Sequence, residues 1–316
     1  MFRYIIKRIL SMIPTLLLTS ILVFLIIRLI PGDPAVATLG EMATEEKLIE
    51  VREQMGLDKP IYVQYGVWMK GVLKGDLGDS IFQRRPVTEI ISERMETTLL
   101  LGILSAIIII IIALPIGIIA ASKANSWIDQ IISSISMFFA AVPAFWLGLT
   151  MMLIFSVKLG IFPTSGFPSI IKTGDISNIR YLILPAFTVA IPNTALIIRM
   201  TRSSMLDVIK EDYVRTARSK GLSLPTVYIK HVFRNSLISI VSSFGFVLAA
   251  LISGSVITEN VFALPGLGQF LISSISLRDY PAVQGVILTI AVIFMLINLL
   301  VDIAYAIIDP RIQYSK

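Results

Sequence analysis

The sequence predicts an all-α integral membrane protein with six transmembrane helices and both termini in the cytoplasm. Two features of composition lead to this fold class. Of the 316 residues, 55% are hydrophobic and only 15% are charged, whereas a soluble domain carries about 25% charged residues. The mean hydropathy is +0.84. A soluble globular protein, a disordered chain and a coiled coil all need more charged surface than this, so the composition excludes these three classes.

The third observation is a set of six long stretches without Asp, Glu, Lys or Arg. A transmembrane helix needs roughly 20 apolar residues to cross the hydrocarbon core of a bilayer. Each stretch reaches or approaches that length, and the last one resumes beyond Asp302. The six predicted spans cover residues 9–27, 97–122, 130–157, 181–198, 235–258 and 280–301.

The first stretch is preceded by Arg3, Lys7 and Arg8, as the core of a signal peptide would be. It is longer than such a core, and no small-residue cleavage site follows it. We therefore expect residues 1–30 to remain as the first transmembrane helix.

The distribution of Lys and Arg predicts the orientation. With the N-terminus inside, the cytoplasmic segments hold 14 of these residues and the short outer loops hold four. Cytoplasmic loops are enriched in Lys and Arg, so both termini should be cytoplasmic. Residues 31–96 then form an extracytoplasmic insert, residues 97–308 a five-helix core, and residues 309–316 a cytoplasmic tail.

The insert carries two patterns that are typical of helices. Thr44-Glu45-Glu46-Lys47 precedes apolar residues at helical spacing, and Gly56 provides a C-terminal cap. Tyr62, Tyr65 and Trp68 fall on one face of a second helix. Two roles remain open for this aromatic face: it rests on the membrane or the core helices, or it binds an external partner.

Prolines and small residues within the spans predict local distortions and close contacts. Each proline removes a backbone hydrogen bond, and the resulting kink suits either a transport pathway or ordinary packing. Ala140, Ala144 and Gly148 form a small-residue stripe, for which we expect close helix packing. The prolines are Pro14, Pro115, Pro143, Pro185 and Pro192.

Several kinds of active site are excluded by residues that the sequence lacks. There is no Cys, and His231 is the single His, so Cys-zinc sites, Fe–S clusters and His-based metal clusters are excluded. No phosphate-binding loop ending in Gly-Lys-Ser/Thr is present. Asp302 is expected at the cytoplasmic boundary, paired with an arginine. No carboxylate or His relay lies in mid-span, which argues against a proton-coupled carrier.

The longest cytoplasmic loop, residues 200–236, predicts a helix, a glycine stop and a second helix. Gly221 follows Arg218 and Lys220 and should cap the first helix. Ser223 should cap the second helix, with Pro225 in its first turn.

Small and apolar side chains in this loop favour contact with another surface. Ala217 and Gly221 are four residues apart, and we expect them to lie on one face. Leu222 and Leu224 offer apolar contacts. The segment suits either a groove in a cytoplasmic partner or the surface of an anionic membrane.

Two blocks in this loop resemble the coupling loop of permease subunits of bacterial ATP-binding-cassette (ABC) importers, in the peptide/nickel branch. They are Asp212-Tyr-Val-Arg-Thr-Ala-Arg-Ser-Lys-Gly221 and His231-Val-Phe-Arg-Asn-Ser-Leu237. Ala217 and Gly221 match the Glu-Ala-Ala and Gly signature of that loop, whereas Arg215 and Thr216 replace its Glu and first Ala. Further blocks similar to the family follow in the expected order: Arg28–Ala35, Gly56–Tyr65, Gly75–Ser80, Glu96–Leu100, Val142–Trp146 and Val261–Gly268.

The resemblance implies a type I ABC importer permease fold in the bacterial cytoplasmic membrane. The chain would be the first of two homologous permease subunits of a peptide importer. Two cytoplasmic ATPases would bind the coupling loop, and an extracytoplasmic binding protein would deliver the substrate. The loop residues implied in ATPase binding are Asp212, Arg215, Ala217, Arg218, Gly221 and Leu222.

The resemblance also limits the chemistry of this chain. ATP and Mg²⁺ would be bound by the ATPases, so this chain would hold no cofactor or metal and would not be an enzyme. Its remaining contacts would be with membrane lipid and not with nucleic acid. None of the blocks assigns the residues that line the substrate pathway.

Three alternatives are weighed against this interpretation. The first is the same machinery importing nickel, another chelated metal or a different small solute. The second is an autonomous carrier or channel, which the long docking loop and the missing relay argue against. The third is a membrane-embedded enzyme, which the lack of Cys, of a His cluster and of paired carboxylates in the spans argues against.

Overall fold

The structure is a computed structural model that describes residues 2–29, 36, 44–54 and 57–308. Within these ranges the regular structure is helical, apart from one isolated bridge between Asp79 and Pro86. The predicted turn at residues 31–34, the Gly56 cap and the tail at 309–316 lie outside the described residues.

The helices follow the apolar runs and the two predicted insert segments. They are α1 (Phe2–Leu29), α3 (Glu45–Gln54), α4 (Ile61–Leu73), α5 (Val87–Ser122), α6 (Trp127–Ala141), α7 (Ala144–Met151), the π-helix η1 (Met152–Lys158), α8 (Ile170–Thr173), the 3₁₀-helix η2 (Ile176–Ile179), α9 (Arg180–Val208), α10 (Asp212–Ser219), α11 (Leu224–Thr226), the π-helix η3 (Val227–Phe233), α12 (Arg234–Val261), α13 (Leu267–Leu277) and α14 (Tyr280–Ile308).

Five of the six predicted spans are confirmed as continuous helices. The second of them, α5, begins at Val87 and not at residue 97. Its first turns contain charged residues, of which Glu89 and Glu93 pair with Arg85. The boundary drawn at residue 96 therefore falls inside a helix. The segments long and apolar enough to cross a membrane are Ile5–Leu25, Val87–Ser122, Ile176–Val208, Leu224–Val261 and Tyr280–Ala304.

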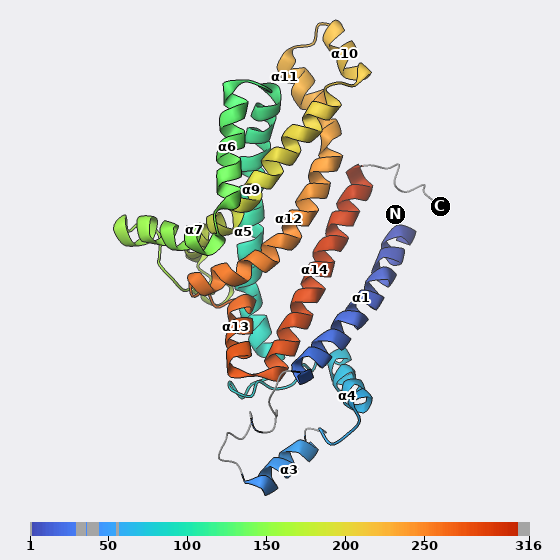
Figure 1. Ribbon diagram of the computed structural model, residues 1–316, viewed down its shortest axis with the longest axis vertical. Coiled ribbons are helices and arrows are strands. Elements are labelled where there is room, and N and C mark those ends of the chain that lie inside the picture. The colour runs from blue at the N-terminus through green and yellow to red at the C-terminus, as the bar shows by residue number, and fades with distance from the viewer. Residues whose placement is uncertain (1, 30–35, 37–43, 55–56, 309–316) are drawn as a thin grey trace.

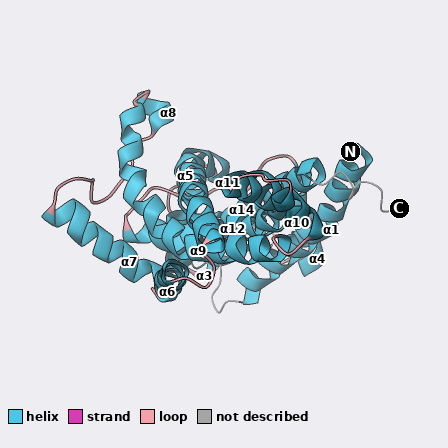
Figure 2. Cartoon of the chain, turned by 90° about the horizontal axis from the view of Figure 1, so that it is seen from above, coloured by secondary structure: helices cyan, strands magenta, loops and turns pink. Residues whose placement is uncertain are grey.

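The predicted third span is broken. The segment α6 meets the segment formed by α7 and η1 at an angle of 98°. Val142 is extended, with φ −73° and ψ 126°, as steric contact with a following proline favours. Pro143 has no N–H with which to continue the helix, so the predicted distortion becomes a full break. Because of it, α7 projects sideways from the bundle (Figure 1, Figure 2).

The core of the bundle is formed by α5 and α9, which pack along most of their length. Gly117 of α5 lies so close to α9 that a Cβ atom there would come within 2.6 Å of Thr201 Cβ. Aliphatic side chains of both helices fill the interface, together with Val247 and Leu251 of α12. Of the candidate spans, the one containing α9 is the most enclosed, at 61% buried.

The small-residue stripe is only partly confirmed. Gly148 is buried, and a Cβ atom there would lie 3.1 Å from Thr188 Cγ2 and 3.3 Å from Phe262 Cε2. Ala140 is exposed. The break after α6 separates it from Ala144, so the expectation of one shared helix face is wrong.

The insert and the loop at 200–236 lie at opposite ends of the bundle (Figure 1). We call the end with α3 and α4 the outer end and the end with α10 the inner end. At the inner side of α1, Arg8 Nε donates to the carboxylate of Asp302 in α14. The predicted pairing of Asp302 with an arginine is therefore confirmed.

This separation predicts that single cysteines at Lys47 and Ser219 are labelled from opposite sides of the membrane. Both side chains are exposed, and the natural chain has no Cys to interfere. A membrane-impermeant maleimide should reach Lys47→Cys from outside the cell and Ser219→Cys only in inverted vesicles. Labelling of both variants from the same side would contradict the topology.

Candidate functional site

The first helix predicted for the loop at 200–236 exists as α10 and is followed by a glycine turn. Gly221 has φ +78°, and its N–H donates to the carbonyl oxygen of Arg218 at 2.9 Å. This left-handed conformation costs glycine little, so the predicted glycine stop is confirmed. No atom lies within 4 Å of the position that a Cβ of Gly221 would take. The space beyond this turn is therefore open.

The buried face of α10 is apolar and attaches the helix to the bundle. Val214 and Ala217, three residues apart on the helix, pack in one cluster with Ala121 of α5 and Met205 of α9. Val227 and Val232 of η3 complete this cluster. Because η3 leads directly into α12, the cluster connects α10 to three long helices at once.

The position of Ala217 corrects the sequence analysis. Its side chain is 6% exposed and faces the bundle, whereas Gly221 is exposed. The expectation that the two residues share one exposed face is wrong, because Ala217 lies three residues after Val214 on the apolar side of the helix. Ala217 is a packing residue beneath the exposed face of α10.

The other face of α10 is charged and accessible. Asp212, Arg215 and Arg218 all lie on it. Arg215 Nη1 lies 3.7 Å from Asp212 Oδ1, and both side chains are more than three-quarters exposed. Such a pair adds little to stability. These charges are therefore available to a partner.

Apolar side chains follow the glycine turn. Leu222 is 40% exposed and Leu224 is 61% exposed. Ser223 precedes α11 as predicted, but its hydroxyl pairs with that of Thr226 at 2.8 Å instead of with a backbone N–H. The exposed surface of this segment thus combines charged and apolar groups.

A buried ion pair fastens α6 to α9 near the inner end. Arg202 donates from Nε to Asp129 Oδ1 at 2.6 Å and from Nη2 to Oδ2 at 2.7 Å. Asp129 is 3% exposed and also accepts the N–H of Asn125 at 2.9 Å. Loss of Arg202 would leave the buried carboxylate of Asp129 without its cationic partner. Sequence reasoning missed this pair because no local pattern links residues 73 positions apart.

At the outer end, Glu259 holds three helices together. Its carboxylate accepts hydrogen bonds from the Thr98 hydroxyl of α5 at 2.8 Å and from the N–H groups of Gly268 and Gln269 at 2.7 and 3.1 Å. A carboxylate is favourable at the start of a helix such as α13. Gly268 cannot carry a side chain, since a Cβ atom would lie 2.5 Å from Val256 Cα.

The sequence analysis did not single out Glu259, because the predicted fifth span stops at residue 258. The helix continues through it to Val261, and Glu259 has no exposed surface. The available signal was an acidic residue that directly continues an apolar run. The structure explains the glycines in the block Val261–Gly268: Gly266 and Gly268 leave room for this carboxylate.

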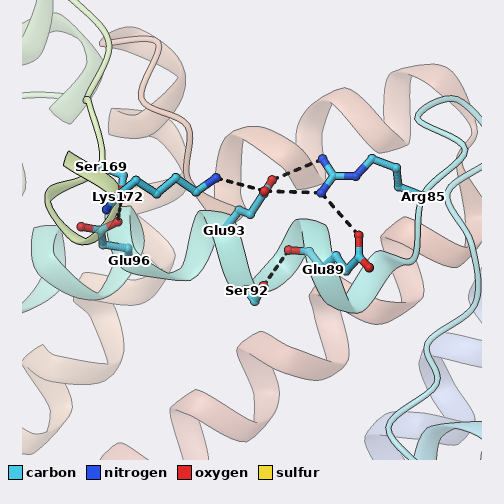
Figure 3. A network of polar contacts seen from close by, with 7 residues as sticks. All are labelled: Arg85, Glu89, Ser92, Glu93, Glu96, Ser169 and Lys172. Carbon is cyan, nitrogen blue, oxygen red and sulfur yellow. Dashed lines mark hydrogen bonds and ion pairs between the residues drawn. The ribbon is translucent and has the colours of Figure 1, made fainter.

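A second polar network lies at the outer end of α5 (Figure 3). Glu93 lies 3.3 Å from Arg85 of the insert and 3.0 Å from Lys172 Nζ in the segment before α9. Glu96 accepts the N–H groups of residues 170 and 171 at 2.8 and 3.0 Å. This network joins the insert, α5 and the outer loop of the core.

The aromatic face of the insert divides into two parts. Tyr65 and Trp68 pack on Phe24 of α1, with ring centroids 5.3 and 5.6 Å apart. The Tyr65 hydroxyl lies 2.8 Å from Ser20 Oγ. These two side chains rest on α1, whereas Tyr62 is 74% exposed and remains accessible.

Two family descriptions together match nearly the whole chain. Residues 113–314 match the binding-protein-dependent transport system inner membrane component, and residues 1–102 match the N-terminal part of such membrane components. The chain belongs to this family. It is therefore a multi-pass inner-membrane permease of an ABC transporter complex, and the family is one of transport proteins, not of enzymes.

Curated relatives agree over the full length. A glutathione transport system permease protein of Salmonella typhi is 43% identical over 315 residues, 100% of each chain. A peptide transport system permease protein of Brucella abortus is 42% identical over 311 residues, 98% of this chain and 99% of the relative.

The fold agrees with a solved transporter. The MetNI methionine ABC transporter in an inward-facing conformation matches with a TM-score of 0.58 and 19% identity, over 70% of this chain and 96% of that chain. The predicted ABC importer permease fold is thereby confirmed. Within the described residues, no three His, Asp or Glu side chains gather as a metal-binding group would.

Replacing Ala217 by Leu should lower the free energy of unfolding by about 1–3 kcal/mol, because it overpacks a filled cluster. The measurement is thermal unfolding of the purified chain in detergent. Ser219→Leu, on the exposed side of the same helix, is the control and should change stability little. Equal losses in both variants would contradict the inward orientation of Ala217.

Replacing Glu259 by Ala should lower the free energy of unfolding by about 3 kcal/mol or more, because buried hydrogen-bond donors lose their acceptor. Glu89→Ala is the matched control, since Glu89 is 59% exposed in its pair with Arg85, and should cost about 1 kcal/mol or less. Thermal unfolding compares the two proteins in the same detergent. A Glu259→Ala protein as stable as Glu89→Ala would refute the role of this carboxylate.

Proposed function

We propose that this chain is a permease subunit of an ATP-driven importer that carries short peptides across the cytoplasmic membrane. The observation that carries the proposal is the two-sided construction of α10. Its apolar face packs on the inner ends of α5 and α9, while its charged face and the turn at Gly221 stay open. The relatives named for peptide and glutathione transport support a peptide substrate.

The proposed complex contains a second homologous permease subunit, two cytoplasmic ATPases and an extracytoplasmic substrate-binding protein. The ATPases bind ATP and Mg²⁺, so this chain needs neither. They contact the exposed coupling surface, and Ala217 supports that surface from beneath. The proposed contact residues are Asp212, Arg215, Arg218, Gly221 and Leu222.

Movement of the ATPases reaches the membrane core through the cluster under α10. A closely packed cluster shifts as a unit and does not absorb a small displacement by compression. The cluster includes the inner ends of α5 and α9 and the π-helix that leads into α12. A push on α10 therefore changes the tilt of three helices together, which suits alternation between outward-facing and inward-facing states.

The insert serves the external side in this proposal. It lies at the end opposite α10 (Figure 1) and presents Tyr62, while Tyr65 and Trp68 hold its second helix on α1. An exposed aromatic side chain on a fixed helix is a suitable contact for a substrate-binding protein. No observation on the described residues favours nickel or another chelated metal as the substrate.

Replacing Gly221 by Leu tests the coupling function. The left-handed backbone strains a branched side chain by about 1 kcal/mol or more, and the side chain enters the open space that the ATPase would occupy. We expect normal amounts of protein in the membrane, weaker ATPase binding, and a loss of labelled dipeptide import of at least tenfold in the reconstituted complex.

Gly174→Leu is the matched control. Gly174 also has a positive φ, +70°, with no atom within 4 Å of a Cβ position, but it ends α8 on the outer side. Its Leu variant should import normally. Normal import by Gly221→Leu, or equal loss in both variants, would contradict coupling at α10. Uptake that unlabelled peptides fail to compete would contradict the peptide substrate separately.

A further inference from the structure

The helix that leads from the loop at 200–236 into the bundle contains a π-turn. This helix runs continuously through α11, η3 and α12, from Leu224 to Val261. Within it, residues Val227–Phe233 form the π-helix η3, in which an N–H donates to the carbonyl group five residues earlier instead of four. Such turns are rare inside α-helices and occur frequently at functional sites. The side chains that η3 buries provide a physical reason for it here.

The π-turn brings Val227 and Val232 to one side of the helix. Both side chains are 0% exposed, and both belong to the cluster under α10. An α-helix has 3.6 residues per turn, so two residues five positions apart would point about 140° away from each other. In a π-helix, residues five positions apart lie about one turn apart. The α form would therefore place only one of these two valines in the cluster.

Burial further along the helix shows that the register changes inside η3. Val232, Ser236 and Ile240 are buried at steps of four residues, as one face of an α-helix requires. One more step of four toward the N-terminus would reach Tyr228. The fully buried residue is Val227 instead, and Tyr228 packs against the cluster while only partly buried. The π-turn thus places a small side chain where the α register would place a large one.

The size of this side chain affects the position of α10. Val214 and Ala217 of α10 pack in the same cluster, against side chains of α5 and α9. A close-packed group accepts a much larger side chain only if one of its members is displaced. The eight-residue helix α10, whose other face is exposed, is displaced more easily than the long helices α5 and α9. The two registers therefore correspond to two positions of α10.

Side-chain donors next to η3 support a change of register. Asn235 Nδ2 donates to the carbonyl oxygen of His231 at 2.7 Å, and Ser236 Oγ donates to that of Val232 at 2.9 Å. A change of register breaks backbone hydrogen bonds at this end of the turn, and a buried carbonyl group without a donor is costly. The two side chains keep these carbonyl groups paired during the change.

We propose that η3 is a two-state register element that is in the π form when α10 is seated close to α5 and α9. In the α form, Tyr228 takes the place of Val227 and α10 lies farther out. The segment before the turn then rotates relative to α12 by about 100°, which is one residue of an α-helix. Small movements of α10 shift the cluster as a unit, whereas the register change is the larger step between two packed arrangements. This inference rests on the proposed coupling function and names the element that makes the coupling discrete.

Deletion of Lys230 tests whether the extra residue is needed. Lys230 is exposed within η3, and without it Val227 is four positions before the second valine, so a plain α-helix buries both. We expect normal amounts of protein in the membrane and retained ATPase binding. Import of labelled dipeptide by the reconstituted complex should fall at least tenfold, because only one register remains. Lys230→Ala keeps the extra residue; it is the matched control and should import as the wild type does.

A second measurement follows the register directly, also where the deletion variant fails to fold. Val227→Cys and Val232→Cys each place one thiol in a chain that has no natural Cys. Both thiols are buried in the π form, whereas in the α form position 227 turns outward and position 232 stays buried. Maleimide labelling of Val227→Cys should differ at least tenfold between the nucleotide-free and the vanadate-trapped complex with the ATPases. Labelling of Val232→Cys should stay slow in both.

The outcomes separate this inference from the proposed function. Normal import after deletion of Lys230 would overturn the register element, and so would equal labelling of Val227→Cys in both states of a complex that hydrolyses ATP. Import by the wild-type complex in the same experiment would leave the proposed function standing. Failure of the wild-type chain to assemble with the ATPases would overturn the proposed function, and this inference with it.

Discussion

At the centre of the bundle, Gly117 leaves room for Thr201, and α5 approaches α9 more closely than a residue with a Cβ atom at 117 would permit. The Thr201 side chain fills this contact, and its buried hydroxyl has no hydrogen-bond partner in the described residues. The close packing of the two helices is therefore kept although this hydroxyl forms no hydrogen bond. The other core helices depend on this pair, because α12 packs on both members and α10 on their inner ends.

The helix α12 connects the two ends of the molecule. Its inner end continues from the cluster that holds α10, and its outer end carries Glu259, whose carboxylate binds α5 and the start of α13. Both attachments consist of buried contacts with defined geometry. If α10 is displaced as the proposed coupling requires, α12 provides a continuous helical connection from this cluster to the outer end.

Long apolar runs and the glycine stop at Gly221 were sufficient to predict five of the six spans, their order and the helix α10, because these features are local. Pairs that form only on folding were not predictable in this way. Asp129 and Arg202 belong to different helices, and Glu259 meets Thr98 across 161 positions. The outcome at each proline was also not predictable: Pro115 and Pro185 lie inside continuous helices, whereas Pro143 follows a full break.

Charged side chains link the helices at the two ends of the bundle. Within the bundle, neutral hydroxyls make the links between helices. Ser105 of α5 donates to the carbonyl oxygen of Ala186 in α9 at 3.3 Å, and Thr188 of α9 donates to its own helix at 3.0 Å and to Met151 Sδ of α7 at 3.7 Å. The strong polar links lie at the ends: Arg202 joins α6 to α9 at the inner end, and Glu259 joins α5, α12 and α13 at the outer end. The contact between α5 and α9 joins these two groups. It consists mostly of aliphatic side chains, with the close approach of Gly117 to Thr201 and the hydrogen bond from Ser105 to Ala186. The charged links therefore fix the ends of the bundle, and close packing fixes its middle.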